Sequence, residues 1–134
     1  MTKFLLLQNY EGGVGCTVPM SDWVPQDIQA HIDFQIALNR ELAEAGELVD
    51  AQGLAGPELA KRVIFGGTDT PVVTDGPFPE FKELLAGYRM VDVESEARAI
   101  EIAALASAAP GPGGVPIQQP IEVRQIMGVP HSDQ

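Results

Sequence analysis

The first apolar run of the chain predicts a strand that is apolar on both faces. In residues 3–8, Phe4 and Leu6 fall on one side of an extended chain, and Leu5 and Leu7 fall on the other. A strand of this kind needs cover on both faces. A Gly-rich loop should follow it, from residue 11 to about residue 22.

Apolar positions three and four residues apart then predict a helix that begins at Trp23 or Pro25 and ends at Ala45. Pro25 suits a first helical turn, Asp22 is the expected N-cap, and Gly46 is the expected stop. The face that should lie on a sheet consists of Ile28, His31, Phe34, Leu38, Leu42 and Ala45.

Shorter apolar segments predict the remaining elements. Strands are expected at residues 47–54, 61–65, 71–74, 84–93 and 121–127. Residues 66–70 have the length and composition of a hairpin turn. A second, Ala-rich helix is expected at 94–108, with an apolar stripe that contains Ala97, Ile100 and Ala104.

The order of these elements is β-α-β, a hairpin, and a second β-α-β unit. This order predicts an α+β protein of ferredoxin-like plan, with both helices on one face of an antiparallel sheet. The other face would carry apolar residues of the strand at 3–8 without helical cover. A second copy of the chain is the simplest cover, so we expect a homodimer. Residues 1–127 should form one domain and 128–134 a flexible tail.

Net charge limits the classes of binding partner that can be expected, and cysteine content indicates the compartment. The net charge is −11, from 19 acidic residues against 8 Lys and Arg, which repels nucleic acid and acidic lipid surfaces. Cys16 is the single cysteine, which fits a reducing compartment. The N-terminal apolar run is too short for a signal peptide, and no run reaches membrane-spanning length. We therefore expect a cytoplasmic protein without a nucleic-acid or membrane partner.

One polar stretch before the strand at 84–93 is distinctive. Asp75-Gly76-Pro77-Phe78, with Glu80, Lys82-Glu83 and Gly87-Tyr88, resembles the signature of YCII-related proteins of the DGPF type. Glu122-Val123-Arg124 resembles the terminal strand of that family. The resemblance covers roughly residues 3–127, and it departs at the long Gly-rich loop and at Gln125, where the family often has Pro.

The resemblance implies a dimeric α+β barrel of ferredoxin-like subunits in a largely uncharacterised family. Some relatives look like small-molecule enzymes that use a His and Asp pair. Relatives of the DGPF type are associated in bacteria with sigma factors of the extracytoplasmic-function class. The resemblance therefore implies either an acid–base enzyme or a non-catalytic ligand-binding or regulatory dimer, and an interaction protein without a pocket is a third alternative.

Asp75 and His31 are the candidate catalytic residues. Asp75 is either a general base at the mouth of a cleft or the cap of its own turn. His31 lies one helical turn after Asp27, at a spacing that lets a carboxylate orient an imidazole for acid–base work. The alternative is a boundary histidine whose ring nitrogens bond to backbone or water.

The candidate substrate-binding residues are Lys82, Arg124, Tyr88 and Tyr10, and Arg89 belongs to the wider set of plausible polar residues. Lys82 could bind an anion or belong to a solvated charge cluster. Arg124 could bind a carboxylate ligand, or it could pair with Glu122 or with an acid of a partner subunit. We expect no metal or cofactor, because two His and one Cys give no zinc set, and the glycines at 12–15 lack the spacing of a nucleotide loop.

Overall fold

The computed structural model describes residues 1–9, 20–56, 59–67, 70–75 and 85–129. The elements in chain order are β1 (Thr2–Asn9), α1 (Pro25–Glu44), β2 (Leu48–Gly53), β3 (Lys61–Ile64), β4 (Val72–Asp75), β5 (Leu85–Val93), α2 (Glu96–Ser107) and β6 (Ile121–Gln125). Short 3-10 turns at Met20–Asp22 and Pro112–Gly114 precede α1 and β6.

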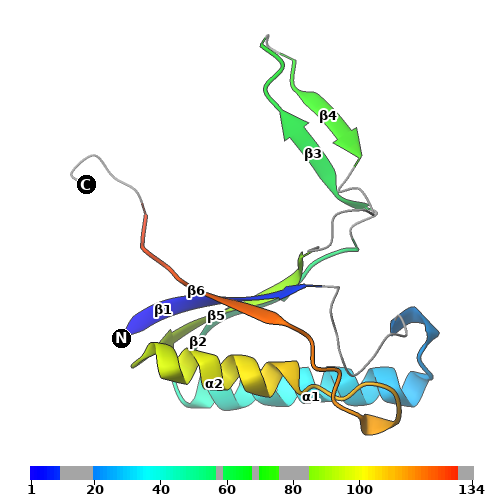
Figure 1. Cartoon of the computed structure of the whole chain (residues 1–134), viewed down its shortest axis with the longest axis vertical. Helices are drawn as coiled ribbons and strands as arrows, with labels where there is room; N and C mark the ends of the chain where they lie inside the picture. Colours follow the sequence, from blue (N-terminus) through cyan, green and yellow to red (C-terminus); the bar gives the residue numbers. More distant parts are fainter. Residues whose placement is uncertain (10–19, 57–58, 68–69, 76–84, 130–134) are drawn as a thin grey trace.

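Four of the strands form one antiparallel sheet in the order β2-β5-β1-β6. Both helices lie on the same face of this sheet (Figure 1). This is the ferredoxin-like arrangement, so the predicted α+β class is confirmed. Within the single chain the sheet is open and does not close into a barrel. Among the described residues, no helix is long and apolar enough to cross a membrane.

Strand alternation divides the side chains of the sheet between two faces. The buried core on the helix side is built from Phe4 and Leu6 of β1, Val91 and Val93 of β5, Leu38 and Leu42 of α1, and Ala99, Ile102, Ala103 and Ala106 of α2. Burying each of the larger side chains contributes roughly 1.5–3 kcal/mol. On the opposite face Leu5 and Leu7 are only partly buried, as the two-sided pattern of this strand predicted.

The stripe predicted for α2 is wrong. Its buried residues are Ala99, Ile102, Ala103 and Ala106, whereas Ile100 is 54% exposed. Alanine and isoleucine occur on several sides of this helix, so apolar spacing alone does not select one face.

The Ser95 side chain caps the start of α2, because it accepts a hydrogen bond from the Arg98 backbone N–H.

The start of α1 also differs from the prediction. The N-cap is Val24, which makes no side-chain cap, and Asp22 lies in the preceding 3-10 turn. Pro25 occupies the first turn, where the missing N–H costs nothing, so the helix begins without a polar cap. At the other end Gly46 adopts a φ of +73°, which confirms it as the residue that ends the helix.

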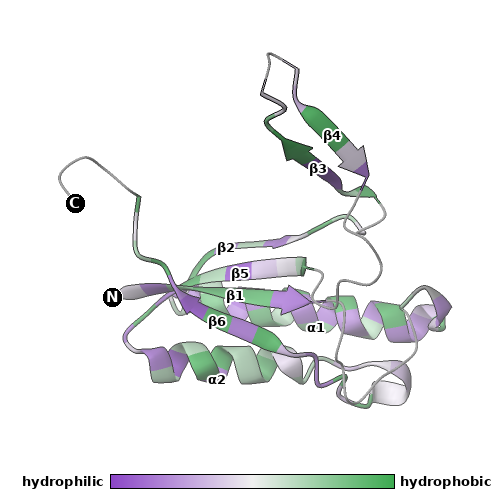
Figure 2. Ribbon diagram, turned by 45° about the horizontal axis from the view of Figure 1, so that its top comes forward, coloured by the Kyte–Doolittle hydropathy of each residue, from purple (hydrophilic) through white to green (hydrophobic). Residues whose placement is uncertain are grey.

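The strands β3 and β4 form a separate two-stranded sheet. This hairpin projects from the body on the side of the main sheet that faces away from the helices (Figure 1). Every residue in both strands is exposed. Much of the hairpin is nevertheless hydrophobic (Figure 2).

One ion pair connects α2 to the segment that leads into β2. Arg98 Nε lies 2.9 Å from Glu47 Oε2, and Arg98 Nη2 lies 2.9 Å from Glu47 Oε1. The hydrogen bonds from Arg98 hold the pKa of Glu47 below its usual value. A depressed carboxyl pKa means that the pair stabilises the fold at neutral pH and that this contribution is lost as the pH falls through the folded-state pKa.

We predict that Arg98→Ala lowers the free energy of unfolding by about 1 kcal/mol at pH 7, because a bidentate but partly exposed pair is lost. The loss should shrink as the pH is lowered into the range where Glu47 is protonated. Urea unfolding at a series of pH values measures this, with the exposed Arg40→Ala as the matched control. A loss that is the same at every pH would contradict the role of Glu47.

Candidate functional site

A cation is buried on the helix side of the sheet. Alternation along β5 puts Arg89 on the same face as Val91 and Val93, and its side chain is only 3% exposed. Arg89 Nε donates to Asn39 Oδ1 at 2.8 Å, and Arg89 Nη2 donates to Gln35 Oε1. Both acceptors are neutral amides of α1, which covers the guanidinium.

Among the residues that the structure describes, no carboxylate forms an ion pair with Arg89. Burial lowers the pKa of this guanidinium, because desolvation disfavours its charged form. An arginine nevertheless stays charged, and a buried charge costs several kcal/mol unless an opposite charge accompanies it. The site therefore has a positive charge that its described neighbours do not balance.

A chain of hydrogen bonds runs from Arg89 to His31. Gln35 accepts from Arg89 through Oε1, so its Nε2 is the atom that faces His31 Nε2, at 3.4 Å. The other ring nitrogen, His31 Nδ1, lies 3.0 Å from the Pro110 carbonyl oxygen, which can only accept. Nδ1 must therefore donate to the Pro110 carbonyl and Nε2 must accept from Gln35. His31 is then the Nδ1–H tautomer, and both of its ring nitrogens are hydrogen-bonded.

Regular helix spacing explains this chain of bonds. His31, Gln35 and Asn39 follow one another at four-residue steps and so lie along one side of α1. His31 is 8% exposed, and its ring meets the edge of Trp23 at a centroid distance of 5.6 Å. A polar stripe of α1 therefore lies against the sheet beside the apolar stripe.

Gln8 adds a further donor on the same face. In the β1–β5 register Gln8 lies opposite Gly87, two pairs beyond Leu6 and Arg89 and therefore on the same face. Gln8 Nε2 is buried and has no hydrogen-bond partner within the described part of the chain. We call Arg89, Gln8, Gln35 and Asn39 the Arg89 cluster. It combines a buried cation with a buried N–H donor that no residue of the described ranges accepts from.

The structure does not bring the two candidate catalytic residues together. Asp75 ends β4 on the projecting hairpin, where its side chain is 84% exposed and lies 2.5 Å from Lys61 Nζ. The hydrogen bond from Lys61 lowers the pKa of Asp75. His31 is a buried residue of α1, and Figure 1 shows the hairpin pointing away from both helices.

The contact between Asp27 and His31 that helix spacing predicted is also not seen among the described residues. The Gly113 backbone N–H donates to Asp27 Oδ2 at 3.3 Å, and His31 bonds to Pro110 and Gln35 instead. Asp27 therefore contacts the turn before β6, not the imidazole.

Tyr88 and Arg124 lie on the sheet face that has no helices. Tyr88 donates from its hydroxyl to Asp50 Oδ2 at 2.8 Å, which lowers the pKa of Asp50 and raises that of Tyr88. Arg124 Nε lies 3.7 Å from Glu122 Oε2, the pairing that the alternative interpretation expected. Lys82 and Tyr10 lie outside the described residues, as do residues 76–83 of the signature stretch.

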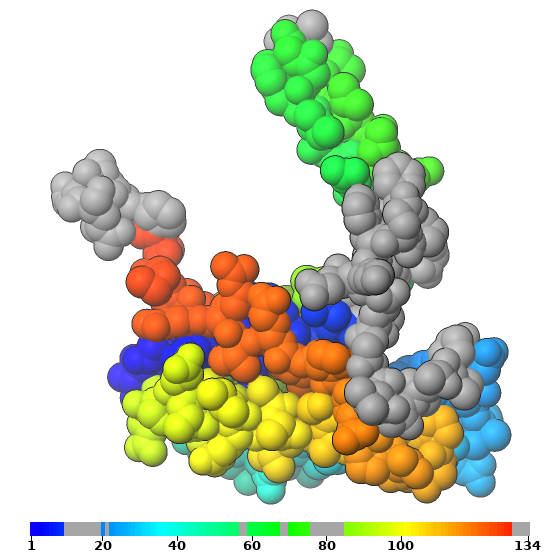
Figure 3. Space-filling model, in the orientation of Figure 1, coloured from blue at the N-terminus to red at the C-terminus, as the bar shows by residue number. Residues whose placement is uncertain are grey.

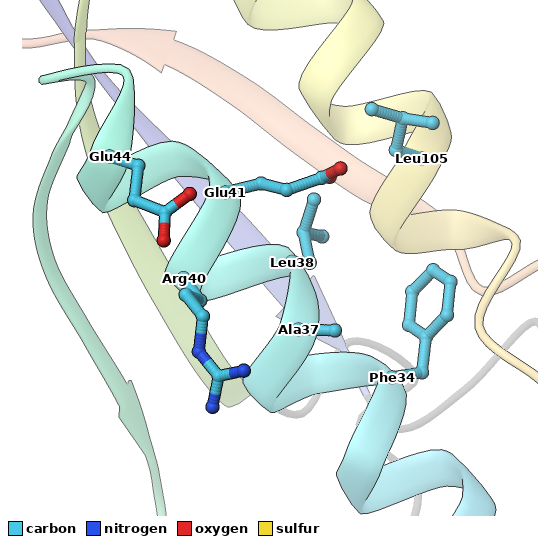
Figure 4. Close-up of a pocket in the computed structure, with 7 residues that line it drawn as sticks. All are labelled: Phe34, Ala37, Leu38, Arg40, Glu41, Glu44 and Leu105. Carbon is cyan, nitrogen blue, oxygen red and sulfur yellow. The ribbon is translucent and has the colours of Figure 1, made fainter.

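A groove of about 320 Å³ lies between the two helices, away from the sheet (Figure 4). It is lined by Phe34, Ala37, Leu38, Arg40, Glu41, Glu44 and Leu105. Its charged residues are exposed helix positions. Its lining contains neither Arg89 nor any of the catalytic or substrate-binding candidates predicted from the sequence.

Sequence reasoning placed Arg89 only in the wider polar set and did not find its partners Gln8, Gln35 and Asn39, although two signals for the cluster were present. Arg89 lies two residues before Val91 and four before Val93, so its side chain points to the same, helix-covered face of the strand. Gln35 and Asn39 follow His31 in steps of four, which places them on one side of the helix.

The sheet order, the one-sided helices and the hairpin insertion together define a ferredoxin-like α+β protein. The model of the YCII-related domain matches residues 3–114, and the chain belongs to this family. No curated protein matches the chain.

We predict that His31 is in the Nδ1–H tautomer, because the Pro110 carbonyl can only accept and Gln35 is oriented by Arg89. Long-range ¹H–¹⁵N correlation spectra of the imidazole ring distinguish the two tautomers. The His131→Gln variant assigns the signals, since the chain has two histidines. An Nε2–H tautomer for His31 would contradict the hydrogen-bond chain.

Proposed function

We propose that this YCII-related protein binds a small carboxylate anion at the Arg89 cluster. The observation that supports this most is the buried guanidinium, whose hydrogen bonds to described residues go to amide oxygens and not to a carboxylate. A planar carboxylate matches a guanidinium well, because it can accept two parallel N–H bonds. Such a ligand would supply the negative charge that the described part of the site lacks.

Two further features favour a small anion with a single charge. Gln8 Nε2, which has no hydrogen-bond partner among the described residues, lies on the same sheet face, two residue pairs from Arg89. The chain as a whole carries a net charge of −11, which repels polyphosphates and other highly charged ligands more strongly than monoanions.

The same geometry favours binding without turnover over acid–base catalysis. A general base must reach the proton that it removes through a hydrogen bond or one water molecule. Both nitrogens of His31 are already engaged, and Asp75 is paired with Lys61 on the hairpin. We therefore propose a ligand-binding protein, and the enzymatic interpretation has less support.

We predict that small monocarboxylates raise the melting temperature of the protein in a dose-dependent way, whereas their uncharged amides do not. Arg89→Met should abolish the effect and Arg89→Lys should weaken it, because lysine lacks the bidentate fork. Thermal shift and titration calorimetry measure this, with Asp75→Asn as a variant that keeps binding.

Gln8→Leu tests the same site without disturbing the partners of Arg89. Loss of one hydrogen bond of about 1 kcal/mol should weaken carboxylate binding roughly fivefold. Equal binding by the wild type, Arg89→Met and Gln8→Leu would place the anion elsewhere and would refute the proposed site.

We also propose that the protein is a homodimer joined through the sheet face that has no helices. Leu5, Leu7 and Met90 lie together at the centre of this face by strand register. The ion pair of Arg124 borders them on one side and the Tyr88–Asp50 bond on the other. An apolar centre within a polar rim is the usual anatomy of a protein interface.

We predict that the wild-type chain sediments as a dimer at micromolar concentration and that Leu5→Glu sediments as a folded monomer, because a charge would be buried at the interface. Ile100→Glu, on the exposed side of α2, is the matched control and should remain dimeric. A wild-type monomer at all accessible concentrations would refute this proposal.

A further inference from the structure

The β3–β4 hairpin exposes more apolar surface than is usual for a segment that is surrounded by water. We call it the arm, meaning residues 61–65 and 72–75. Val63 is 63% exposed, Ile64 56% and Phe65 80%, and Val72 and Val73 are also exposed. Pairing in the arm sets Val63 opposite Val73 and Ile64 opposite Val72. Because side chains alternate along each strand, one of these pairs lies on each face of the arm.

The described part of the chain does not cover this surface. The arm stands apart from the described atoms of the body in the space-filling view (Figure 3). An isolated two-stranded hairpin is at best marginally stable in water. A contiguous apolar surface on a soluble protein usually marks an interaction site. The arm therefore has the composition of a segment that packs against another molecule.

The charge of the arm indicates the kind of molecule against which it packs. β3 carries Lys61 and Arg62, and β4 carries Asp75, which pairs with Lys61. The arm therefore has one positive charge in excess, in a chain whose net charge is −11. Two copies of such an acidic chain repel each other, and a segment with an excess positive charge, carried by Arg62, reduces this repulsion where it reaches across. The complementary partner for the arm is consequently an acidic body such as a second copy of this chain.

The direction of the arm suits the same partner. It rises on the side of the sheet that faces away from the helices (Figure 1). A copy whose sheet faces this sheet would lie on that side, within reach of the arm. In a two-fold dimer every such contact occurs twice, so each subunit would receive the arm of the other.

We propose that the arm of each subunit packs on the body of a second copy and holds the homodimer together. This inference rests on the proposed homodimer and adds an arm exchange to it. Apolar residues on both faces of the arm would then be buried in the dimer, and Lys61 and Arg62 would lie near the acidic surface of the partner.

Hydrogen exchange and sedimentation test the exchange of arms with the full-length chain. In the dimer, the backbone amides of residues 61–64 and 72–75 should exchange at least tenfold more slowly than in the monomeric Leu5→Glu variant. Val73→Glu and Ile64→Glu should each raise the dimer dissociation constant at least tenfold. Ile100→Glu introduces the same charge on α2 and should leave the constant unchanged.

The possible results distinguish failure of the arm proposal from failure of the homodimer proposal. A wild-type dimer whose dissociation constant is unchanged by Val73→Glu and Ile64→Glu overturns the arm proposal and leaves the homodimer standing. Equal protection of the arm in the wild type and in Leu5→Glu also overturns it, because the arm would then pack on its own chain. A monomeric wild type overturns both proposals.

Discussion

The structure depends on one constraint, which is that helices cover only one face of the sheet. Both helices lie on the same side, so strand alternation gives each side chain of the four strands one of two environments. Phe4 and Leu6 join the core, whereas Leu5 and Leu7 of the same strand do not. The proposed dimer follows from the uncovered face, and the arm projects on that same side.

Arg89 is the exception on the covered side. Its neighbours Val91 and Val93 are core residues, and a hydrophobic side chain at this position would need no partner. The chain instead aligns Gln35 and Asn39 along α1 to bond it. Proteins tend to break local packing rules where function requires it. A buried cation with amide partners, beside a donor that has no partner among the described residues, is such a departure, and it is the basis of the binding proposal.

Much of the fold could be predicted from the chain because it depends on local patterns. The two-sided run at 3–8, the long helix that ends at Gly46 and the order of the elements led to the ferredoxin-like plan. The apolar face of α2 could not be found in this way, because alanines occur around much of the helix. The Val24 cap was missed because Asp22 is chemically the better cap.

The candidate site was harder to predict because it depends on distances between segments far apart in the chain. The signature stretch drew attention to Asp75, but the direction of the hairpin, which no local pattern specifies, places Asp75 away from His31. Asp27 was expected beside His31 from helix spacing, yet the turn at Gly113 provides it with a different partner. The inward direction of Arg89 could have been found from its position along the strand, but the amides that bond it only become evident once α1 is placed on the sheet.

The most direct test of carboxylate binding at the Arg89 cluster is a crystal structure of the full chain saturated with a carboxylate that stabilises it. We predict that the carboxylate lies within hydrogen-bond distance of the Arg89 guanidinium and of Gln8 Nε2. A carboxylate bound elsewhere, with Arg89 still bonded only to Gln35 and Asn39, would contradict this prediction.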